Sequence, residues 1–336
     1  MPWYNIPMEK TTETKIKTLS VLGPTASGKT ALAVGLVRLF DGEIVSCDSM
    51  QLYRGMDIGT ATPDPEERAG IAHWLLDIAE PEEDFSAADY ARLAGEAVAD
   101  IAKRGRLPIL CGGTGMYHDS LMKISGFTET VKDESLRDEL YAYAAEHGNE
   151  ALHHVLEELD PDAAAGIHPN NVKRVVRAIE VCRVSGRTKT EIDREQIGGE
   201  IPYDDCPIIL TFEDRALLYA RIDRRVELMM ESGLEEEARA LLLSGRPVSQ
   251  TAAQAIGYKE FWPYFRGECA LEDVAAAIKL ATRHYAKRQM IWFRRYPDAY
   301  RLAPDENGAM KSPEKLLAQA AEIFRRHTQK GLSQIG

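Results

Sequence analysis

The chain has 336 residues, of which 44% are hydrophobic and 28% are charged, with a formal net charge of -12. This composition predicts a folded chain with a large core, long enough for one large domain and an insertion. No apolar run approaches the roughly 18 to 20 residues that span a bilayer, and residues 1–17 lack the apolar core of a signal peptide, so we expect a cytoplasmic protein that does not enter a membrane. The five cysteines form no C-x-x-C pair and have no histidines at zinc-binding spacing, which indicates reduced structural thiols.

The first predicted elements enclose a phosphate-binding motif. Residues 18–22 form an apolar run typical of a buried strand, and residues 31–40, rich in Ala, Leu and Val, are typical of a helix. Between them the pattern G-x-x-x-x-G-K-[ST] is matched by Gly23, Pro24, Thr25, Ala26, Ser27, Gly28, Lys29 and Thr30. The glycines let backbone N–H groups converge at the positive end of the helix, Lys29 adds a full charge, and Thr30 is placed to hold Mg2+. This loop predicts a phosphate or diphosphate site.

Two further predicted strands end in polar residues. Residues 43–47 read as a strand that ends at Asp48, and residues 107–111 read as another. The second runs directly into Gly112, Gly113, Thr114 and Gly115. Because ligands of open parallel sheets bind outside the carboxyl ends of the strands, Asp48 is expected to face the phosphate loop. The glycines around Thr114 would let a ligand approach closely, although a tight turn with a capping threonine explains the same pattern.

Helical periodicity then dominates from about residue 124 to residue 203. The helices are predicted at residues 134–146, 150–159 and 171–185, with Asn170 as N-cap and Gly186 as the end of the third. No convincing strand lies between them, whereas residues 207–212 read as a strand of the core again. We therefore predict an α/β fold, a P-loop NTPase-like parallel sheet core formed by residues 15–123 and 204–310, with an inserted all-helical subdomain at 124–203. Flexible tails are expected at 1–14 and 327–336.

Basic residues gather in two segments despite the acidic total. The segment in the insertion contains Lys173, Arg174, Arg177, Arg183, Arg187 and Lys189. The other, in a predicted helix at residues 275–293 and just beyond, contains Arg283, Lys287, Arg288, Arg294 and Arg295. Each segment is either a contact for nucleic acid or a solvated helix face.

Arg225 is out of place in the predicted helix at residues 215–231. It lies at the edge of the apolar stripe that Ile222 and Met229 help to form, whereas Arg224 points elsewhere. An arginine pushed toward the core needs an anion, since an uncompensated buried charge costs several kcal/mol. Either a phosphate-rich ligand or a carboxylate of the chain supplies that anion.

The motifs taken together resemble one enzyme family, the bacterial tRNA dimethylallyltransferases. The resemblance runs in unbroken order from about residue 19 to residue 295. It is carried by residues 23–30, 48–61, 112–117, 255–260 and 285–289. Thr62 stands where the family usually has lysine, and His118 is unusual after Tyr117. No segment could build the zinc finger that eukaryotic relatives often append.

The resemblance implies transfer of a dimethylallyl group from its diphosphate to N6 of the adenosine immediately 3′ of the anticodon. Asp48 would accept or orient the amine proton, Thr114 would lie beside the reacting groups, and Arg225 would bind the leaving diphosphate together with Lys29 and Mg2+. The implied tRNA contacts are Ser49, Met50, Gln51, Arg137, Lys173, Arg174, Arg177, Gln254, Gly257, Tyr258 and Lys259. The expected partners are dimethylallyl diphosphate and the anticodon stem-loop of tRNA, and we expect a monomer.

The main alternative is a small-molecule P-loop kinase, in which ATP fills the loop and Asp48 activates an acceptor hydroxyl. Such a kinase needs neither the inserted basic helix nor the pair of Arg225 and Thr114. A prenyltransferase that acts on free adenine nucleotides is disfavoured by the same insertion. A nucleotide-switched RNA-binding module without bond-making chemistry is disfavoured by Asp48 at the mouth of the loop.

Overall fold

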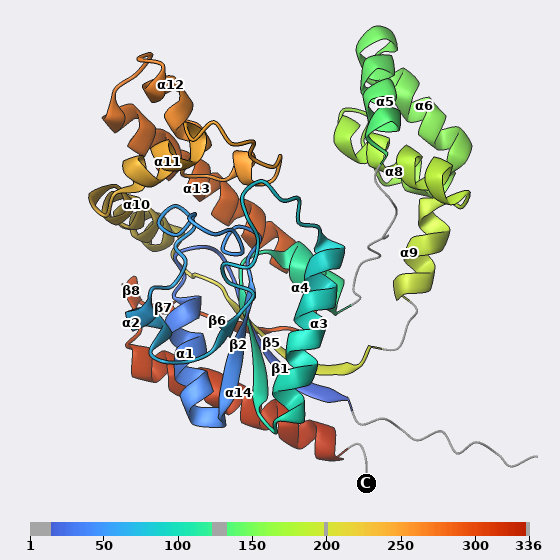
Figure 1. Ribbon diagram of the computed structural model, residues 1–336. Coiled ribbons are helices and arrows are strands. Elements are labelled where there is room, and N and C mark those ends of the chain that lie inside the picture. The colour runs from blue at the N-terminus through green and yellow to red at the C-terminus, as the bar shows by residue number, and fades with distance from the viewer. Residues whose placement is uncertain (1–14, 123–132, 198–200, 334–336) are drawn as a thin grey trace, which may run out of the picture.

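A six-stranded parallel sheet forms the centre of the computed structural model, which describes residues 15–122, 133–197 and 201–333 (Figure 1). The strand order is β3-β2-β4-β1-β5-β6. The strands are β1 (Ile16–Leu22), β2 (Gly42–Cys47), β3 (His73–Trp74), β4 (Leu107–Gly112), β5 (Tyr203–Leu210) and β6 (Tyr300–Leu302). A short antiparallel pair, β7 (Asp305–Glu306) and β8 (Ala309–Met310), lies outside this sheet. The parallel core predicted from the sequence is confirmed.

Helices cover both faces of the sheet, which is why β2 is buried throughout and β4 is buried at every residue but its first. Helices α1 (Lys29–Phe40) and α14 (Pro313–Ser333) pack on one face, where Leu36 and Phe324 join the apolar core. Helix α3 (Ala87–Lys103) packs on the other face, and its N-terminus is closed by a capping box of Ser86 and Asp89. The short helices α2 (Pro65–Arg68) and α4 (Gly115–Leu121) complete this half.

Helix α14 extends further than the sequence predicted. We expected a flexible tail from residue 327, but the helix runs to Ser333. Its last turns are held because His327 lies 3.4 Å from an Asp204 carboxylate oxygen and 3.4 Å from the Tyr300 hydroxyl. The expected tail at 1–14 and the expected domain boundary near 123 lie outside the described residues.

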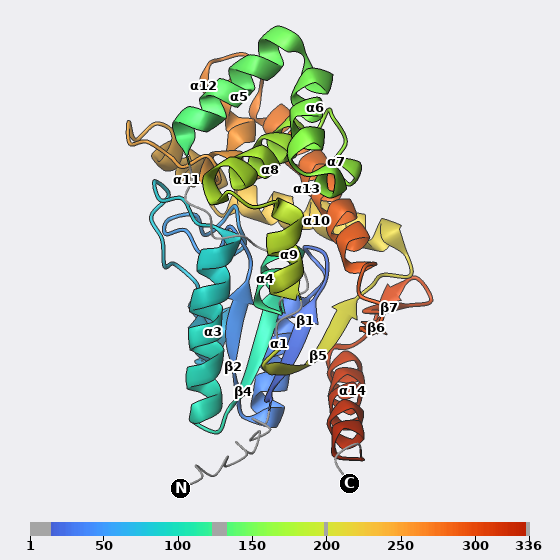
Figure 2. The same ribbon diagram turned by 90° about the vertical axis from the view of Figure 1, so that its right-hand side faces the viewer.

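In the described residues between α4 and β5 five helices follow one another, and Figure 2 shows them above the carboxyl ends of the strands. They are α5 (Glu134–His147), α6 (Asn149–Leu159), α7 (Pro161–Ala165), α8 (Val172–Ser185) and α9 (Lys189–Ile197). They share a core of their own, built around Leu152, Leu156 and Ile179. The predicted N-cap of α8 is wrong by one residue: Asn171 occupies that position, while the Asn170 side chain accepts a hydrogen bond from Asn149. Gly186 ends α8 in the left-handed conformation, as predicted.

A second group of helices lies on the opposite side of the same edge of the sheet (Figure 1). It consists of α10 (Arg215–Glu231), α11 (Leu234–Leu242), α12 (Trp262–Phe265) and α13 (Leu271–Phe293). Two short 3-10 turns, Ala252–Gln254 and Lys259–Phe261, link α11 to α12. Helix α13 begins four residues before the predicted start at residue 275, because Asp273 accepts a hydrogen bond from the Ala270 N–H and caps it.

Gly112, the last residue of β4, allows this strand to approach β2 closely. A Cβ atom at this position would lie 2.0 Å from the Cys47 carbonyl oxygen, so a side chain forces the two strands apart. We expect Gly112→Ala to lower the free energy of unfolding by about 1–3 kcal/mol or more, measured by urea denaturation. Gly95→Ala in the middle of α3 is the matched control, since its new methyl meets only ordinary contacts. Equal stability of the two variants would contradict the steric explanation.

Candidate active site

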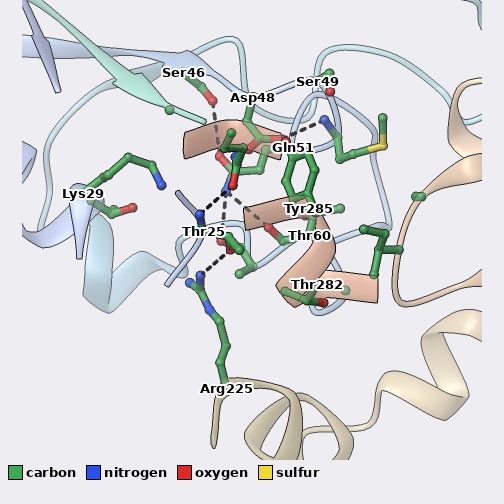
Figure 3. Close-up of a pocket in the computed structure, with 18 of the residues that line it drawn as sticks. Thr25, Lys29, Ser46, Asp48, Ser49, Gln51, Thr60, Arg225, Thr282 and Tyr285 are labelled. Carbon is green, nitrogen blue, oxygen red and sulfur yellow. Dashed lines mark hydrogen bonds between the residues drawn. The ribbon is translucent and has the colours of Figure 1, made fainter. Parts of the chain in front are cut away.

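A cavity of about 270 Å3 opens at the carboxyl ends of β1, β2 and β4. Figure 3 shows that its polar side chains come from the loop after β1, the end of β2, and helices α10 and α13. Residues 59–61 and 254–256 close it from two further sides. The cavity therefore lies where an open parallel sheet is expected to bind its ligand, between the core and the second helical group.

The loop between β1 and α1 has the backbone of a phosphate cradle. Gly28, just before α1, adopts φ 89°, and Ala26 adopts φ 61°, so the N–H groups of the loop turn toward the start of the helix. The Lys29 ammonium donates to the Pro24 carbonyl oxygen at 2.7 Å and lines the cavity together with Thr30. Burial lowers the pKa of Lys29 to about 8, which an arriving anion would raise again.

Arg225 reaches the same loop from α10. Its guanidinium donates to the Thr25 hydroxyl at 3.4 Å and points into the cavity in Figure 3. Burial lowers its pKa. In the part of the chain that the structure describes, Arg225 forms no ion pair with a carboxylate, so an internal salt bridge does not explain its position. Arg221, one turn earlier, donates to the Ala26 carbonyl oxygen at 2.9 Å and braces the loop.

Asp48 follows β2 directly and faces the cavity on the side of Tyr285 (Figure 3). One carboxylate oxygen accepts a hydrogen bond from the Met50 N–H at 2.9 Å, which fixes the turn after the strand. Burial raises the pKa of Asp48, although the Met50 N–H and the nearby Lys29 ammonium partly offset this effect. A half-buried carboxylate of raised pKa beside the glycine-rich loop is suited to accept a proton from a ligand.

Thr114 supports the Asp48 turn from the neighbouring strand. Its hydroxyl oxygen accepts a hydrogen bond from the Ser49 N–H at 3.0 Å, and the hydroxyl donates to the Ser49 hydroxyl at 3.3 Å. Thr114 is the N-cap residue of α4, yet its side chain makes no capping hydrogen bond there. The alternative of a capping threonine is therefore not what the structure shows, and Thr114 instead holds the residue next to Asp48.

Gln289 joins the phosphate loop to the glycine turn after β4. Its side-chain carbonyl accepts from the Thr25 N–H at 2.8 Å, and its amide donates to the Gly113 carbonyl oxygen at 2.9 Å. The side chain is only 5% exposed, so both contacts are protected from water. Sequence reasoning included Gln289 in a motif without giving it a role. Its position one turn after Tyr285, on the buried face of a long helix, could have indicated that Gln289 makes buried hydrogen bonds.

The predicted contacts to a target base divide into two groups. Ser49, Met50, Gln51, Gln254 and Lys259 line the cavity. Gly257 and Tyr258 lie behind its wall: Tyr258 is fully buried and donates to a carboxylate oxygen of Glu237 at 2.7 Å. In this conformation the Tyr258 side chain has a packing role and offers no surface to RNA.

The basic residues of the insertion also divide into two groups. Arg137 and Arg177 donate to the carboxylate of Glu180, at 2.9 Å and 2.5 Å, and Glu180 is fully buried in α8. Burial alone would raise the pKa of Glu180, but the hydrogen bonds from these arginines outweigh it and lower the pKa. Lys173 and Arg174 are exposed, and among the described residues neither has an ion-pair partner. Within the basic segment from Lys173 to Lys189, which the structure describes in full, these two cations are the ones left free for an external phosphate.

The second basic segment is also partly neutralised within the protein. The Arg283 guanidinium forms a two-pronged ion pair with Asp223 on α10, with its shorter contact at 2.6 Å. Arg288 lines the cavity and lies over the ring of Tyr285, 5.7 Å from its centre. Helix α13 therefore binds α10 through the ion pair of Arg283 and supplies the cavity with the positive charge of Arg288.

The two positions that depart from the family pattern have structural partners. Thr62 shares a hydrogen bond with the Thr60 hydroxyl at 2.8 Å, in the loop that closes the cavity. His118 lies on α4 and is buried against β1 and β5. Its imidazole nitrogens lie 3.1 Å from the Ser20 hydroxyl, 3.2 Å from an Asp205 carboxylate oxygen and 3.1 Å from the Tyr296 hydroxyl. His118 thus satisfies buried polar groups of the fold, whereas Thr62 pairs with a half-buried hydroxyl.

The fold and the cavity define a P-loop-like α/β protein in which the Asp48 carboxylate faces the glycine-rich loop after β1. A family model described as IPP transferase matches residues 51–296. The tRNA dimethylallyltransferase of Geobacillus thermodenitrificans is 46% identical over 309 residues, which cover 92% of this chain and 95% of the relative. That of Acetivibrio thermocellus is 45% identical and covers 89% and 94%. The chain therefore belongs to the IPP transferase family.

Solved structures agree with this assignment. The tRNA isopentenylpyrophosphate transferase of Bacillus halodurans superposes with a TM-score of 0.70 at 39% identity, covering 96% of this chain and all of that one. A eukaryotic dimethylallyltransferase acting on tRNA superposes with a TM-score of 0.72 at 29% identity, covering 85% of this chain and 73% of that one. The similarity extends through the core and the insertion.

Proposed function

We propose that the protein transfers a dimethylallyl group from dimethylallyl diphosphate to N6 of the adenosine immediately 3′ of the anticodon in tRNA, and releases diphosphate. Two relatives named tRNA dimethylallyltransferase are 45% and 46% identical to the chain along most of its length. Within the chain, one observation carries the proposal: the half-buried Asp48 carboxylate shares a cavity with Lys29 and Arg225. This arrangement pairs a base with a site for an anionic leaving group.

The cations of the phosphate loop act on the donor. The N–H groups of the loop, Lys29 and Arg225 would hold the diphosphate and offset the charge that grows on it as the bond between carbon and oxygen breaks. Because Lys29 and Arg225 are half-buried and already oriented by Pro24 and Thr25, they need little reorganisation during the reaction.

Asp48 acts on the acceptor. As the N6 nitrogen forms its bond to the allylic carbon, the amine must lose a proton, and Asp48 would accept it. An adenine amine is a weak nucleophile, so a positioned base should contribute about 10²- to 10⁴-fold to the rate. Thr114 would keep the carboxylate in place through Ser49, since the two residues are hydrogen-bonded across the strands.

Mg2+ fits the donor set of the cavity. The described residues contain no cluster of three or more His, Cys, Asp or Glu side chains that could hold a metal ion alone. Mg2+ commonly takes only one or two oxygens from the protein and the rest from phosphates and water, and the Thr30 hydroxyl is such an oxygen. We propose that Thr30 holds Mg2+ when diphosphate is bound, and the ion then supplies positive charge to the leaving group.

In the described part of the chain, no helix has the length and apolar character needed to cross a bilayer. The location in the cytoplasm and the monomeric state that we expect from the sequence are proposals.

The proposed function is tested by supplying alternative donors and acceptors. The protein is incubated with unmodified tRNA and either dimethylallyl diphosphate labelled in its prenyl group or ATP labelled in its terminal phosphate. We expect the prenyl label to be retained on the RNA. Retention of the phosphate label would instead identify a kinase. Prenylation of free adenine nucleotides in place of tRNA would identify the other alternative enzyme.

The exposed cations of the insertion should determine the salt dependence of tRNA binding. Replacing Lys173 and Arg174 by alanine together removes about two phosphate contacts, so the slope of log K against log salt should become shallower by roughly 1 to 2. The measurement is a salt titration of tRNA binding by filter retention. Exchange of the exposed Arg194, which pairs with Asp162, for alanine is the control. An unchanged slope in the double variant would show that these two residues do not meet phosphate.

A further inference from the structure

Three consecutive backbone N–H groups beside the cavity converge on one side chain. The N–H groups of Asp57 and Ile58 donate to Oε2 of Glu237 at 2.9 Å each, and that of Gly59 donates to Oε1 at 3.0 Å. Converging N–H groups of this kind form a nest for an anion, and here the protein supplies the anion itself. Glu237 lies on α11, about 180 residues further along the chain, so it restrains the loop from another part of the fold.

The same carboxylate holds a second segment. Oε1 of Glu237 also accepts a hydrogen bond from the Tyr258 hydroxyl at 2.7 Å. The Tyr258 ring lies directly against Gly59, where an added Cβ atom would sit 2.6 Å from ring carbons. Gly257 also lies against Gly59, since a Cβ atom added to Gly257 would be 3.4 Å from the Gly59 Cα atom. Glu237 therefore fastens the loop at 57–61 to the segment at 254–259.

Both fastened segments form walls of the cavity. Gly59, Thr60 and Ala61 line it from one segment, and Gln254, Ala255 and Lys259 line it from the other. The loop is also tied to the residues after Asp48, because the Gln51 side-chain amide donates to the Ala61 carbonyl oxygen at 3.0 Å. A displacement of this loop would therefore also move the turn that carries the Asp48 carboxylate.

We propose that Glu237 is a positioning residue for the acceptor adenosine: it joins the two cavity walls that receive the base and so places N6 against Asp48. The inference rests on the proposed function. The donor side is held by different contacts, from Gln289 to Thr25 and from Lys29 to Pro24, and does not involve Glu237. Loss of Glu237 should therefore affect the acceptor and spare the donor. A displacement of about 1 Å at a reacting centre costs about a hundredfold in rate, so loosening this wall should be readily measured.

Three variants of the full-length protein test this inference. Glu237→Gln keeps the shape but turns an NH2 group toward backbone N–H groups. Tyr258→Phe removes one hydrogen bond and leaves the loop contacts in place. Gly59→Ala pushes the loop away from the Tyr258 ring without changing the carboxylate. Glu236→Gln, at an exposed position on the same helix, is the matched control.

For each variant, kcat and KM are measured with tRNA, and the affinity for dimethylallyl diphosphate is measured without RNA by calorimetry. In Glu237→Gln and Gly59→Ala we expect kcat/KM for tRNA to fall by about 10- to 100-fold, and in Tyr258→Phe by about 2- to 10-fold. The affinity for dimethylallyl diphosphate should be unchanged in all three. Glu236→Gln should match the wild type in both measurements.

An unchanged kcat/KM in Glu237→Gln, or an equal loss of diphosphate affinity, would overturn the inference. If Glu237→Gln does not fold, Tyr258→Phe and Gly59→Ala decide by the same two criteria. Failure of the proposed function is a separate result, since the wild type itself would then not prenylate tRNA. If the wild type prenylates tRNA and Glu237→Gln has the same kcat/KM, only the positioning role of Glu237 is contradicted.

Discussion

Replacement of Asp48 by asparagine should lower turnover on tRNA at least about a hundredfold, because an amide cannot accept the amine proton. The amide oxygen can still accept the hydrogen bond from the Met50 N–H, so the turn after β2 should keep its shape. Removing a negative charge beside Lys29 and Arg225 should leave the affinity for dimethylallyl diphosphate unchanged or increase it. The measurements are single-turnover rates with saturating substrates and calorimetric binding of the donor.

The pH dependence gives Asp48 a second test. The ionised carboxylate is the active form, and burial raises its pKa above that of an ordinary aspartate. Activity should therefore be lost as the pH falls through this raised pKa, at a higher pH than for an exposed aspartate. The acidic limb should disappear in Asp48→Asn and persist in Asp298→Asn, which changes an exposed aspartate. Turnover of Asp48→Asn close to that of the wild type would remove Asp48 from the proton transfer.

Local sequence predicted the parts of the site whose geometry is set by neighbouring residues. The loop at 23–30 carries its own turn signals, lysine and flanking strand and helix, so its position followed from the motif. Asp48 followed from its place at the end of a strand in a parallel sheet. Arg225 was found because its charge interrupts an apolar stripe, and the structure brings it to Thr25.

Contacts between distant residues could not be predicted in the same way. Thr114 and Ser49 are 65 residues apart, Glu237 and Gly59 are 178 apart, and Gln289 and Thr25 are 264 apart. A glutamate or glutamine on a helix looks like any solvated residue until the fold places backbone donors opposite it. The pairing of Arg137 with the buried Glu180 was missed for the same reason, so the sequence overstated the free positive charge of the insertion.

Replacement of Arg225 by glutamine should weaken the donor side of the reaction and leave tRNA binding nearly unchanged. The guanidinium is half-buried at the phosphate loop and has no carboxylate partner among the described residues, so we assign it to the diphosphate. We expect kcat/KM for dimethylallyl diphosphate to fall by about 10²- to 10³-fold, as for loss of a buried donor that stabilises growing negative charge. Steady-state kinetics with saturating tRNA measure this loss.

Arg224→Gln is the matched control for this prediction. Arg224 precedes Arg225 on α10 but is exposed and pairs with Glu227 at 3.2 Å, so it carries the same charge without facing the cavity. Its replacement should change neither substrate's kinetics. Arg225→Lys tests whether positive charge near the loop is sufficient, in which case this variant would be as active as the wild type. Loss of activity in Arg225→Lys would show that the guanidinium must bridge Thr25 and the leaving group. An equal loss of tRNA affinity in Arg225→Gln would contradict its assignment to the diphosphate, because tRNA would then depend on the same cation.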